Sequence, residues 1–395
     1  MPVALTLSGV LLVIAWMWLR LAKREVSMPI WSTLEIPELA ADESPLVSVI
    51  VSSRNEAHNI GRCVQSLLRQ DYPRFEIIAV DDHSGDGTWE RLLEIKASEE
   101  GILRILRAAS SSREWLGRPA AFQQGIEVAR GEWLLFTTAD SYHTPNLLSR
   151  AMACARVQGL SLLTLAPRQE CRTFWEHVWQ PIALQYLALM MPTSRGGWAS
   201  EAFLLISREA YVKAGGHVGV GAEDQAGSVL MRRIKSLGYR VDFVKAMDLL
   251  QARAYRTFRE LWDGGGAHLY SLLGAHLFWG ATHALALWTW TVLPFAALVP
   301  AFAFGFWGLD AVRGWWDVVL AVCAILAVAT ILQAESVLRR VHRQNHFYTA
   351  TLPLGGLCLG AALMAAVVRR ATRERGLVSG EYVPDAETLP SNERR

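Results

Sequence analysis

The run Val47-Ser-Val-Ile-Val-Ser-Ser-Arg-Asn-Glu56 begins the part of the chain that decides the fold. Two later runs share its plan, in which a short apolar stretch ends abruptly in polar, acidic or glycine residues: Ile77-Ile-Ala-Val-Asp-Asp-His-Ser-Gly-Asp-Gly-Thr88 and Trp133-Leu-Leu-Phe-Thr-Thr-Ala-Asp140. Apolar stretches of this length, separated by helix-like segments, predict buried parallel strands in an α/β fold.

Polar residues follow each of these predicted strands. Ligands in open α/β sheets bind beyond the carboxyl ends of the strands, so we expect Asn55, Asp81, Asp82 and Asp140 to converge on one crevice. Carboxylates that meet in one crevice indicate a site with a chemical role.

The segments between these runs complete the α/β pattern. Apolar residues recur at helical spacing between residues 56 and 70, and Asp71-Tyr-Pro73 stops that helix. A second helix is predicted over 89–97, and a third leads from Trp115 to Gly131. The predicted strands cover residues 47–52, 76–80, 103–106, 132–137, 160–165 and 240–244.

The composition indicates a membrane protein. The 395 residues allow two or three domains, and the hydrophobic share of 52% with 16 Trp is too high for an ordinary soluble chain. The excess lies at the two ends. A net charge of +2 gives no indication of nucleic-acid binding. The five Cys show no metal-binding spacing, which predicts a reduced compartment and no structural zinc.

Apolar stretches at both ends divide the chain into parts. Residues 3–19 are almost wholly apolar and predict a membrane anchor, with a cleaved signal peptide or a buried helix as the alternatives. About three C-terminal spans are expected near 281–307, 316–334 and 352–368. The predicted parts are an N-terminal transmembrane anchor (1–24), a linker (25–45), an α/β domain (46–265), a C-terminal transmembrane region (266–370) and a disordered tail (371–395).

Basic residues predict the orientation in the membrane. Arg20, Lys23 and Arg24 follow the first span, so the positive-inside rule places the α/β domain in the cytosol. Four spans would put the basic loop at 339–343 in the cytosol, as the positive-inside rule requires. They would also put the basic run that begins at Arg369 outside the cell, against the same rule. The number of spans therefore stays open at this point.

A tryptophan-rich segment follows the fifth predicted strand. Phe174, Trp175, Val178, Trp179 and Ile182 fall roughly on one helical face. Such a helix lies either in the membrane interface or in an ordinary core.

The ordered motifs resemble those of the family 2 inverting glycosyltransferases with the GT-A fold, over roughly residues 47–262. The fold that this resemblance implies is a Rossmann-like α/β nucleotide-sugar domain. Four segments match in order: Ser-Arg-Asn-Glu (53–56), Val-Asp-Asp-x-Ser-x-Asp-x-Thr (80–88), Ala-Asp (139–140) and Glu223-Asp224.

The resemblance implies a seat for a nucleoside-diphosphate sugar. In the family, aspartates after the second strand hold the base and ribose, a role that falls here on Asp81 and Asp82, with Asn55 and Glu56 beside them. Arg118 stands at the basic position of the family's Gly-Lys-x-x-Ala-x-Asn-x-Gly element, which implies contact with the nucleotide's phosphates or base. The alternative for Arg118 is a solvated residue at a helix start.

The resemblance also implies a metal ligand and a catalytic base. Asp140 is the expected ligand of a divalent cation, Mg²⁺ or Mn²⁺, which prefers oxygen ligands. The family normally has Asp-x-Asp, whereas this chain has Thr138-Ala-Asp140, so we expect the cation to bind weakly. Asp224 is the expected base for the acceptor hydroxyl, with Glu223 as its acidic neighbour.

The region after the predicted base bears on the acceptor. Processive polysaccharide synthases of the family carry Gln-x-x-Arg-Trp, but here the tryptophan of Arg256-Thr-Phe-Arg-Glu-Leu-Trp262 is displaced by two positions, which favours transfer of a single sugar. The Arg-Glu-Leu-Trp-Asp-Gly run and the C-terminal spans resemble membrane glycosyltransferases acting on carotenoid acids or hopanoids. The resemblance implies a multi-pass enzyme of the cell membrane with a lipid or other membrane-associated acceptor.

Two other classes of protein compete with this interpretation. A non-catalytic relative that binds nucleotide or partner proteins is supported by Thr138, but the retained Asp82, Asp140 and Asp224 argue against it. A transporter is suggested by the spans alone. No predicted span carries the paired intramembrane charges that such a protein usually needs.

Overall fold

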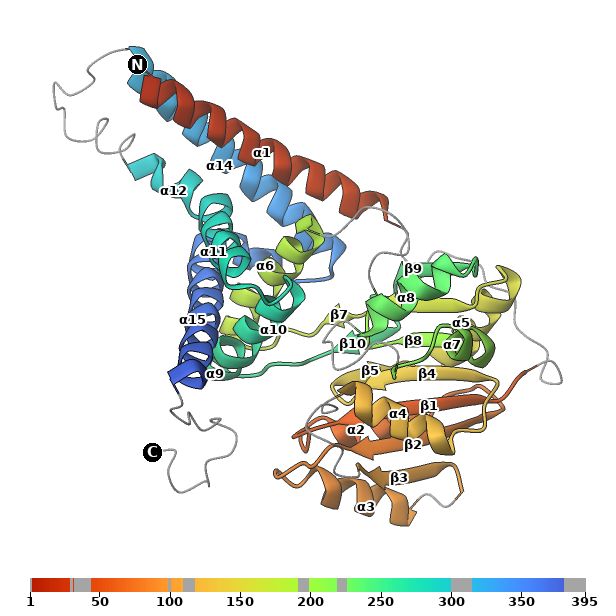
Figure 1. Ribbon diagram of the computed structural model, residues 1–395. Helices are drawn as coiled ribbons and strands as arrows, with labels where there is room; N and C mark the ends of the chain where they lie inside the picture. Colours follow the sequence, from red (N-terminus) through yellow and green to blue (C-terminus); the bar gives the residue numbers. More distant parts are fainter. Residues whose placement is uncertain are drawn as a thin grey trace.

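A computed structural model of the protein describes residues 2–28, 31, 44–98, 101–108, 118–190, 199–218, 226–299 and 315–379. Figure 1 shows a sheet covered by helices on both faces and, beside it, a group of long helices. We call this second region the helical bundle.

The sheet contains all six strands predicted from the sequence. Its order is β3-β2-β1-β4-β8-β6-β9, and β8 alone runs antiparallel to its neighbours. Ser53 of β1 pairs with Asp81 of β2, and Ser52 pairs with Thr138 of β4, so the carboxyl ends of these strands lie side by side. The strands are β1 (Val47–Ser53), β2 (Phe75–Asp81), β3 (Leu103–Arg107), β4 (Trp133–Thr138), β6 (Leu162–Ala166), β8 (Leu204–Ser207) and β9 (Val241–Lys245).

Alternating side chains of the sheet form two cores. Val49 and Val51 belong to the core on one face, and Ile50 between them belongs to the core on the other, because successive strand residues point to opposite faces. The first core is covered by α2 (Ile60–Leu68), α3 (Thr88–Ser98) and α5 (Leu147–Val157). The second is covered by α4 (Arg118–Val128), α7 (Arg208–Lys213) and α8 (Ala226–Ser236).

A second, three-stranded sheet was not predicted. Its order is β5-β10-β7, with β5 (Ser141–His143), β10 (Leu250–Ala252) and β7 (Arg168–Gln169). Strands of two or three residues are too short to show an alternating pattern. Because β5 and β7 directly follow β4 and β6, this small sheet extends the carboxyl edge of the large one.

The helical bundle joins the two ends of the chain. Figure 1 shows α1 beside α14 and α11 beside α15, and both pairs are in contact. Its long helices are α1 (Pro2–Ser27), α6 (Phe174–Met190), α11 (Leu277–Thr291), α14 (Trp315–Val341) and α15 (Leu352–Ser379). Its short elements are α9 (Phe258–Glu260), η3 (Leu261–Gly265), α10 (Gly266–Leu272), α12 (Leu293–Ala296) and η4 (His346–Thr351).

Three helices within the described residues are long and apolar enough to cross a membrane, at Val3–Ser27, Val318–Val341 and His346–Thr372. The described residues therefore give two C-terminal spans where about three were expected. The first expected stretch begins as α11, which has 15 residues, fewer than a span needs, and ends before Pro294. Residues 300–314 lie outside the described part of the chain.

Two of these helices extend beyond the apolar stretches expected from the sequence. Helix α14 continues past residue 334 to Val341, which places Arg339 on the same helix as the buried Glu335, 2.6 Å from its carboxylate. This span thus carries a buried ion pair that the sequence analysis had excluded. Arg339 also donates to the carbonyl of His177, so the pair fastens α14 to α6. Helix α15 likewise runs on to Ser379, past the predicted boundary at 370.

Helix α6, the tryptophan-rich segment, packs as part of the bundle. Trp179, Ile182 and Tyr186 are buried and share a core with α1, α14 and α15. Phe174 and Met190, at its two ends, are partly exposed. The inner face of α6 therefore belongs to a protein core, the second of the two alternatives for this helix.

Candidate functional site

A cavity of about 770 Å³ opens at the carboxyl edge of the large sheet and is lined by residues of both regions. Its strand-end wall contains Ser52, Arg54, Glu56, Asp82, Thr138 and Asp140. Its bundle wall contains Trp179, Ala183, Leu184, Leu187, Leu261 and Leu269. The structure thus brings Asp82 and Asp140 together as expected, and the cavity continues from them into the bundle.

The two neighbouring aspartates at the end of β2 lie in different surroundings: Asp81 is its last residue and Asp82 follows it. Asp82 lines the cavity, with Arg54 Nη1 3.8 Å and His83 Nδ1 3.3 Å from its carboxylate. Asp81 is fully buried and does not line the cavity, because successive side chains at a strand end point to opposite faces. Its Oδ2 accepts the Ser84 N–H at 3.4 Å, while Oδ1 has no partner among the described residues.

Asn55 connects two loops rather than lining the cavity. It has a positive φ of 55°, in the left-handed region that asparagine tolerates better than most residues. Its side-chain oxygen accepts the Gly85 N–H at 3.0 Å, and its own N–H donates to Ser84 at 2.9 Å. Asn55 therefore holds the loop after β1 against the loop after β2, which contains Asp82.

Glu56 and Asp140 form an acidic pair on the wall. Burial and, to a smaller extent, the Asp140 carboxylate together raise the pKa of Glu56 to about 7, against the opposing effect of a hydrogen bond from Asn59. A carboxyl group in this state is charged only in part at neutral pH. A cation placed between the two carboxylates would remove their repulsion.

Arg118 stands at the start of α4 and lines the same wall. Its guanidinium lies 2.6 Å from the carboxylate of Glu201, which also lines the cavity. The residues described before α4 end at Ala108, so the structure describes only the C-terminal part of the expected basic element. Glu201 was not predicted, because it lies in a turn without a strand-end pattern.

Thr138 occupies the first position of the altered motif. It lines the cavity, and its hydroxyl lies 3.1 Å from that of Ser141 on β5. The Ala139 N–H donates to the Ser52 carbonyl at 3.2 Å, which continues the β1–β4 ladder into the motif. The backbone is therefore fixed at this position, and the side chain brings no charge.

The predicted catalytic residues Glu223 and Asp224 lie outside the described residues. Helix α8 begins at Ala226. Ser228 in its first turn lines the cavity, and its hydroxyl oxygen accepts a hydrogen bond from the Ala199 N–H at 3.0 Å.

The bundle half of the cavity is mainly apolar. Its side chains come from α6, η3 and α10, which also pack against the candidate spans. The Arg-Glu-Leu-Trp-Asp-Gly run is partly contained in η3, a π-helix, and such turns often occur at functional sites. A Cβ on Gly264 would lie 2.8 Å from the Tyr255 ring, so glycine allows η3 to pack closely on this wall residue.

Four polar residues of the bundle end were not predicted as site residues. Arg24 and Glu25 of α1, Lys245 at the end of β9, and His342 after α14 all line the cavity. Lys245 follows a predicted strand directly, a signal that could have found it. Glu25 and His342 come from distant parts of the chain, and no sequence signal marked them as site residues.

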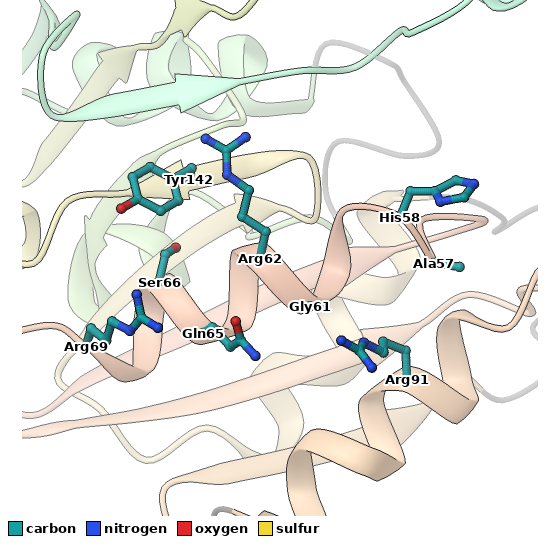
Figure 2. Close-up of a pocket in the computed structure, with 9 residues that line it drawn as sticks. All are labelled: Ala57, His58, Gly61, Arg62, Gln65, Ser66, Arg69, Arg91 and Tyr142. Carbon is teal, nitrogen blue, oxygen red and sulfur yellow. The ribbon is translucent and has the colours of Figure 1, made fainter.

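A smaller cavity of about 210 Å³ lies on the outer face of α2 (Figure 2). Arg62 and Tyr142 lie against each other there, and Arg91 reaches toward α2 from α3. The Arg62 guanidinium is 2.6 Å from Glu170, and that of Arg91 is 2.6 Å from Glu94. Both guanidinium groups thus have a carboxylate partner, and the strand-end residues named above line the larger cavity instead.

Part of the chain is similar in sequence to known glycosyltransferases. Residues 48–213 match the model of Glycosyl transferase family 2. The chain is 33% identical over 98 residues to the poly(ribitol-phosphate) beta-glucosyltransferase of Bacillus spizizenii, covering 24% of this chain and 15% of that protein. It is 31% identical over 121 residues to glycosyltransferase AglE of Haloferax volcanii, covering 30% and 38%. The matches thus span less than half the length of these relatives.

A solved structure shares the fold over most of the chain. The mannosyltransferase PcManGT from Pyrobaculum calidifontis, in complex with GDP-Man and Mn²⁺, superposes with a TM-score of 0.52 at 18% identity. The superposition covers 84% of this chain and 98% of that one. The predicted GT-A fold is confirmed.

Proposed function

We propose that this chain, which carries a family 2 glycosyltransferase domain with the GT-A fold, is a membrane-bound enzyme. It transfers a single sugar, with inversion, from a nucleoside-diphosphate sugar to a lipid or other membrane-associated acceptor. The basic residues after the first span support a catalytic domain that faces the cytosol.

The continuous cavity is the observation that carries this proposal. At one end it presents Asp82 and Asp140 at the strand ends, where α/β sheets bind nucleotides. At the other end it is lined by apolar side chains of helices that pack on the candidate spans. A polar donor and an apolar acceptor would meet between these two ends.

The reaction assigns a task to each group of residues. Asp82 accepts hydrogen bonds from the nucleoside, and Asn55 and the buried Asp81 hold the loop around it. Arg118 meets the donor's phosphates. Asp224, two residues before α8, takes the proton of the acceptor hydroxyl while the oxygen attacks the anomeric carbon and the bond to the diphosphate breaks.

The residues of the strand-end wall fit a divalent cation, Mg²⁺ or Mn²⁺. No group of three or more His, Cys, Asp or Glu within the described residues forms a complete metal site. Asp140 and Glu56 nevertheless offer carboxylate oxygens on one wall, and a cation bound by few protein ligands completes its shell with phosphates. When bound, the cation neutralises charge on the leaving diphosphate.

Release of nucleotide by the purified full-length protein tests the proposed activity. UDP-glucose, UDP-N-acetylglucosamine and GDP-mannose are supplied separately with Mg²⁺ and a bacterial lipid extract, and free nucleoside diphosphate is measured. A glycosyltransferase releases nucleotide from at least one donor. A non-catalytic relative binds a donor without releasing nucleotide, and a polysaccharide synthase builds a water-soluble polymer.

Replacing Asp82 with alanine is expected to weaken nucleotide binding by at least tenfold, about 1.4 kcal/mol. The variant removes a carboxylate that faces the cavity and leaves the buried Asp81 in place. Calorimetry with UDP and GDP measures the effect. Asp248→Ala is the matched control, because that carboxylate pairs with Arg343 outside the cavity. Equal affinity of wild type and Asp82→Ala would remove Asp82 from the nucleotide site.

Restoring the family's carboxylate should strengthen cation binding. Thr138→Asp places a second acidic group two residues before Asp140 on the same wall, so the half-saturating Mg²⁺ concentration is expected to fall at least threefold. Titration of transfer activity with Mg²⁺ measures it. Thr138→Asn, which has nearly the same shape without the charge, is the control. A concentration that stays constant or rises would show that Thr138 does not face the cation.

A further inference from the structure

A buried cluster of charges lies at the bundle end of the cavity, away from the nucleotide residues. Lys245 Nζ is 2.7 Å from the carboxylate of Glu25, and His342 Nε2 is 3.3 Å from it. The side chains of Lys245 and Glu25 are each 4% exposed. Arg24 lies 3.3 Å from the same carboxylate and also donates to the carbonyl of Ala188. We call these four residues the α1–β9 cluster.

The positive charges of this cluster exceed the negative ones. Arg24 and Lys245 share the single carboxylate of Glu25, and His342 adds a third group that can be positive. The other ion pairs nearby are balanced: Arg339 pairs with Glu335, and Arg343 with Asp248. Buried charges persist when they are paired, so a bound anion would stabilise a surplus of positive charge on a cavity wall.

Two further observations indicate that the surplus of positive charge binds a ligand. The Nε of Arg24 is buried and has no hydrogen-bond partner among the described residues. Burial lowers the pKa of Lys245 even though Glu25 acts in the opposite direction, and Arg24 contributes to the lowering. A bound anion would accept a hydrogen bond and stabilise the charged lysine.

The sheet sets the distance between this cluster and the donor. Lys245 ends β9, three strands from β4 in the order β4-β8-β6-β9, and strands lie about 4.8 Å apart, so the two ends of the site are on the order of 14 Å apart. The donor end holds the carboxylates of Asp82, Asp140 and Glu56, whereas the surplus of positive charge lies in the α1–β9 cluster. The apolar wall of α6, with Ala183, Leu184 and Leu187, lies along the same cavity.

We propose that the α1–β9 cluster is a subsite for the anionic headgroup of the lipid acceptor, a phosphate or carboxylate, whose apolar chain lies along α6. This inference rests on the proposed function, because it assigns the acceptor of the same cavity. The anion is an anchor that positions the acceptor. The cluster also explains why the end of the first span is built into the catalytic domain: α1 supplies half of the headgroup site.

Direct binding to matched amphiphiles tests the proposal. Radiolabelled hexadecyl phosphate and hexadecanol have the same chain and differ in charge, and inorganic phosphate has the charge without the chain. With purified full-length protein in detergent micelles, hexadecyl phosphate is expected to bind at least tenfold more tightly than hexadecanol. Inorganic phosphate should compete only at concentrations at least a hundredfold higher. Competition at similar concentrations would assign the cluster to a free anion and overturn the lipid subsite.

Variants with opposite expected effects separate binding from folding damage. Lys245→Gln removes a buried positive charge and should abolish the preference for hexadecyl phosphate. Arg24→Gln changes a less buried residue and should reduce this preference, so it serves as the test if Lys245→Gln does not fold. Glu25→Gln removes the competing carboxylate and should increase affinity for hexadecyl phosphate at least threefold, which structural damage would not do. Arg343→Gln is the matched control, since that residue pairs with Asp248 and does not line the cavity.

Nucleotide release by the same preparations keeps the two proposals distinguishable. A protein that releases nucleotide but binds hexadecyl phosphate and hexadecanol alike, with no change in Arg24→Gln or Glu25→Gln, contradicts the headgroup subsite and leaves the enzyme proposal standing. A protein that prefers hexadecyl phosphate but releases no nucleotide from any donor contradicts the proposed function and, with it, the assignment of the bound lipid as an acceptor.

Discussion

Replacing Asp140 with asparagine is expected to lower sugar transfer by about a hundredfold to a thousandfold, the usual cost of removing a group that stabilises charge in a transition state. Asp140 lines the cavity at the end of β4, and its carboxylate is close enough to raise the pKa of Glu56. Steady-state transfer rates over a range of Mg²⁺ and Mn²⁺ concentrations measure the effect.

The cation dependence makes the Asp140 prediction specific. The residual activity of Asp140→Asn should no longer rise with added cation, whereas Asp248→Asn, outside the cavity, should behave as wild type. A wild-type enzyme that is fully active in excess EDTA and unaffected by Asp140→Asn would contradict the metal assignment. Arg118 and other basic groups would then have to balance the leaving diphosphate.

Filling the bundle half of the cavity is expected to stop lipid glycosylation while sparing the donor site. Ala183→Trp places an indole among Leu184, Leu187 and Leu269, where the acceptor chain is proposed to lie. Transfer to lipid should fall at least tenfold, and UDP or GDP affinity should stay within twofold, because no nucleotide residue lies on α6. Transfer assays with a lipid extract and calorimetry with free nucleotide measure the two quantities.

A control of the same size distinguishes obstruction from overpacking. Extra bulk in a packed site costs about 1–3 kcal/mol of stability, so thermal unfolding of Ala183→Trp must be compared with that of wild type. Ala97→Trp makes the same substitution on the exposed face of α3 and should keep full transfer. Unimpaired lipid transfer by a folded Ala183→Trp enzyme would place the acceptor elsewhere.

The sequence predicted the parts of the fold that have a repeating pattern. Strand ends such as Asp82 and Asp140 were placed correctly, because apolar runs locate buried strands and parallel strands bring their carboxyl ends together. The small strands β5, β7 and β10 were missed, because two or three residues carry no period. Helix α11 ends at Thr291, and Pro294 lies in the first turn of the short helix α12 that follows.

The site was predicted only where its residues lie close to a motif. Asp81 and Asp82 are adjacent in one motif, and only the structure shows that Asp82 faces the cavity. Glu25 and Lys245 are 220 positions apart, so no local pattern connects them. Their contact forms because the end of α1 packs against the end of β9 in the tertiary structure.

Transfer of labelled sugar into lipid is the most direct test of the central claim. Full-length protein is reconstituted in nanodiscs made from a bacterial lipid extract and given UDP-[¹⁴C]glucose, UDP-N-[¹⁴C]acetylglucosamine or GDP-[¹⁴C]mannose with Mg²⁺. One donor is predicted to yield butanol-extractable label, equimolar with released nucleotide and absent with Asp140→Asn. Nucleotide release without label in the lipid phase, or no release from any donor, would contradict a lipid glycosyltransferase.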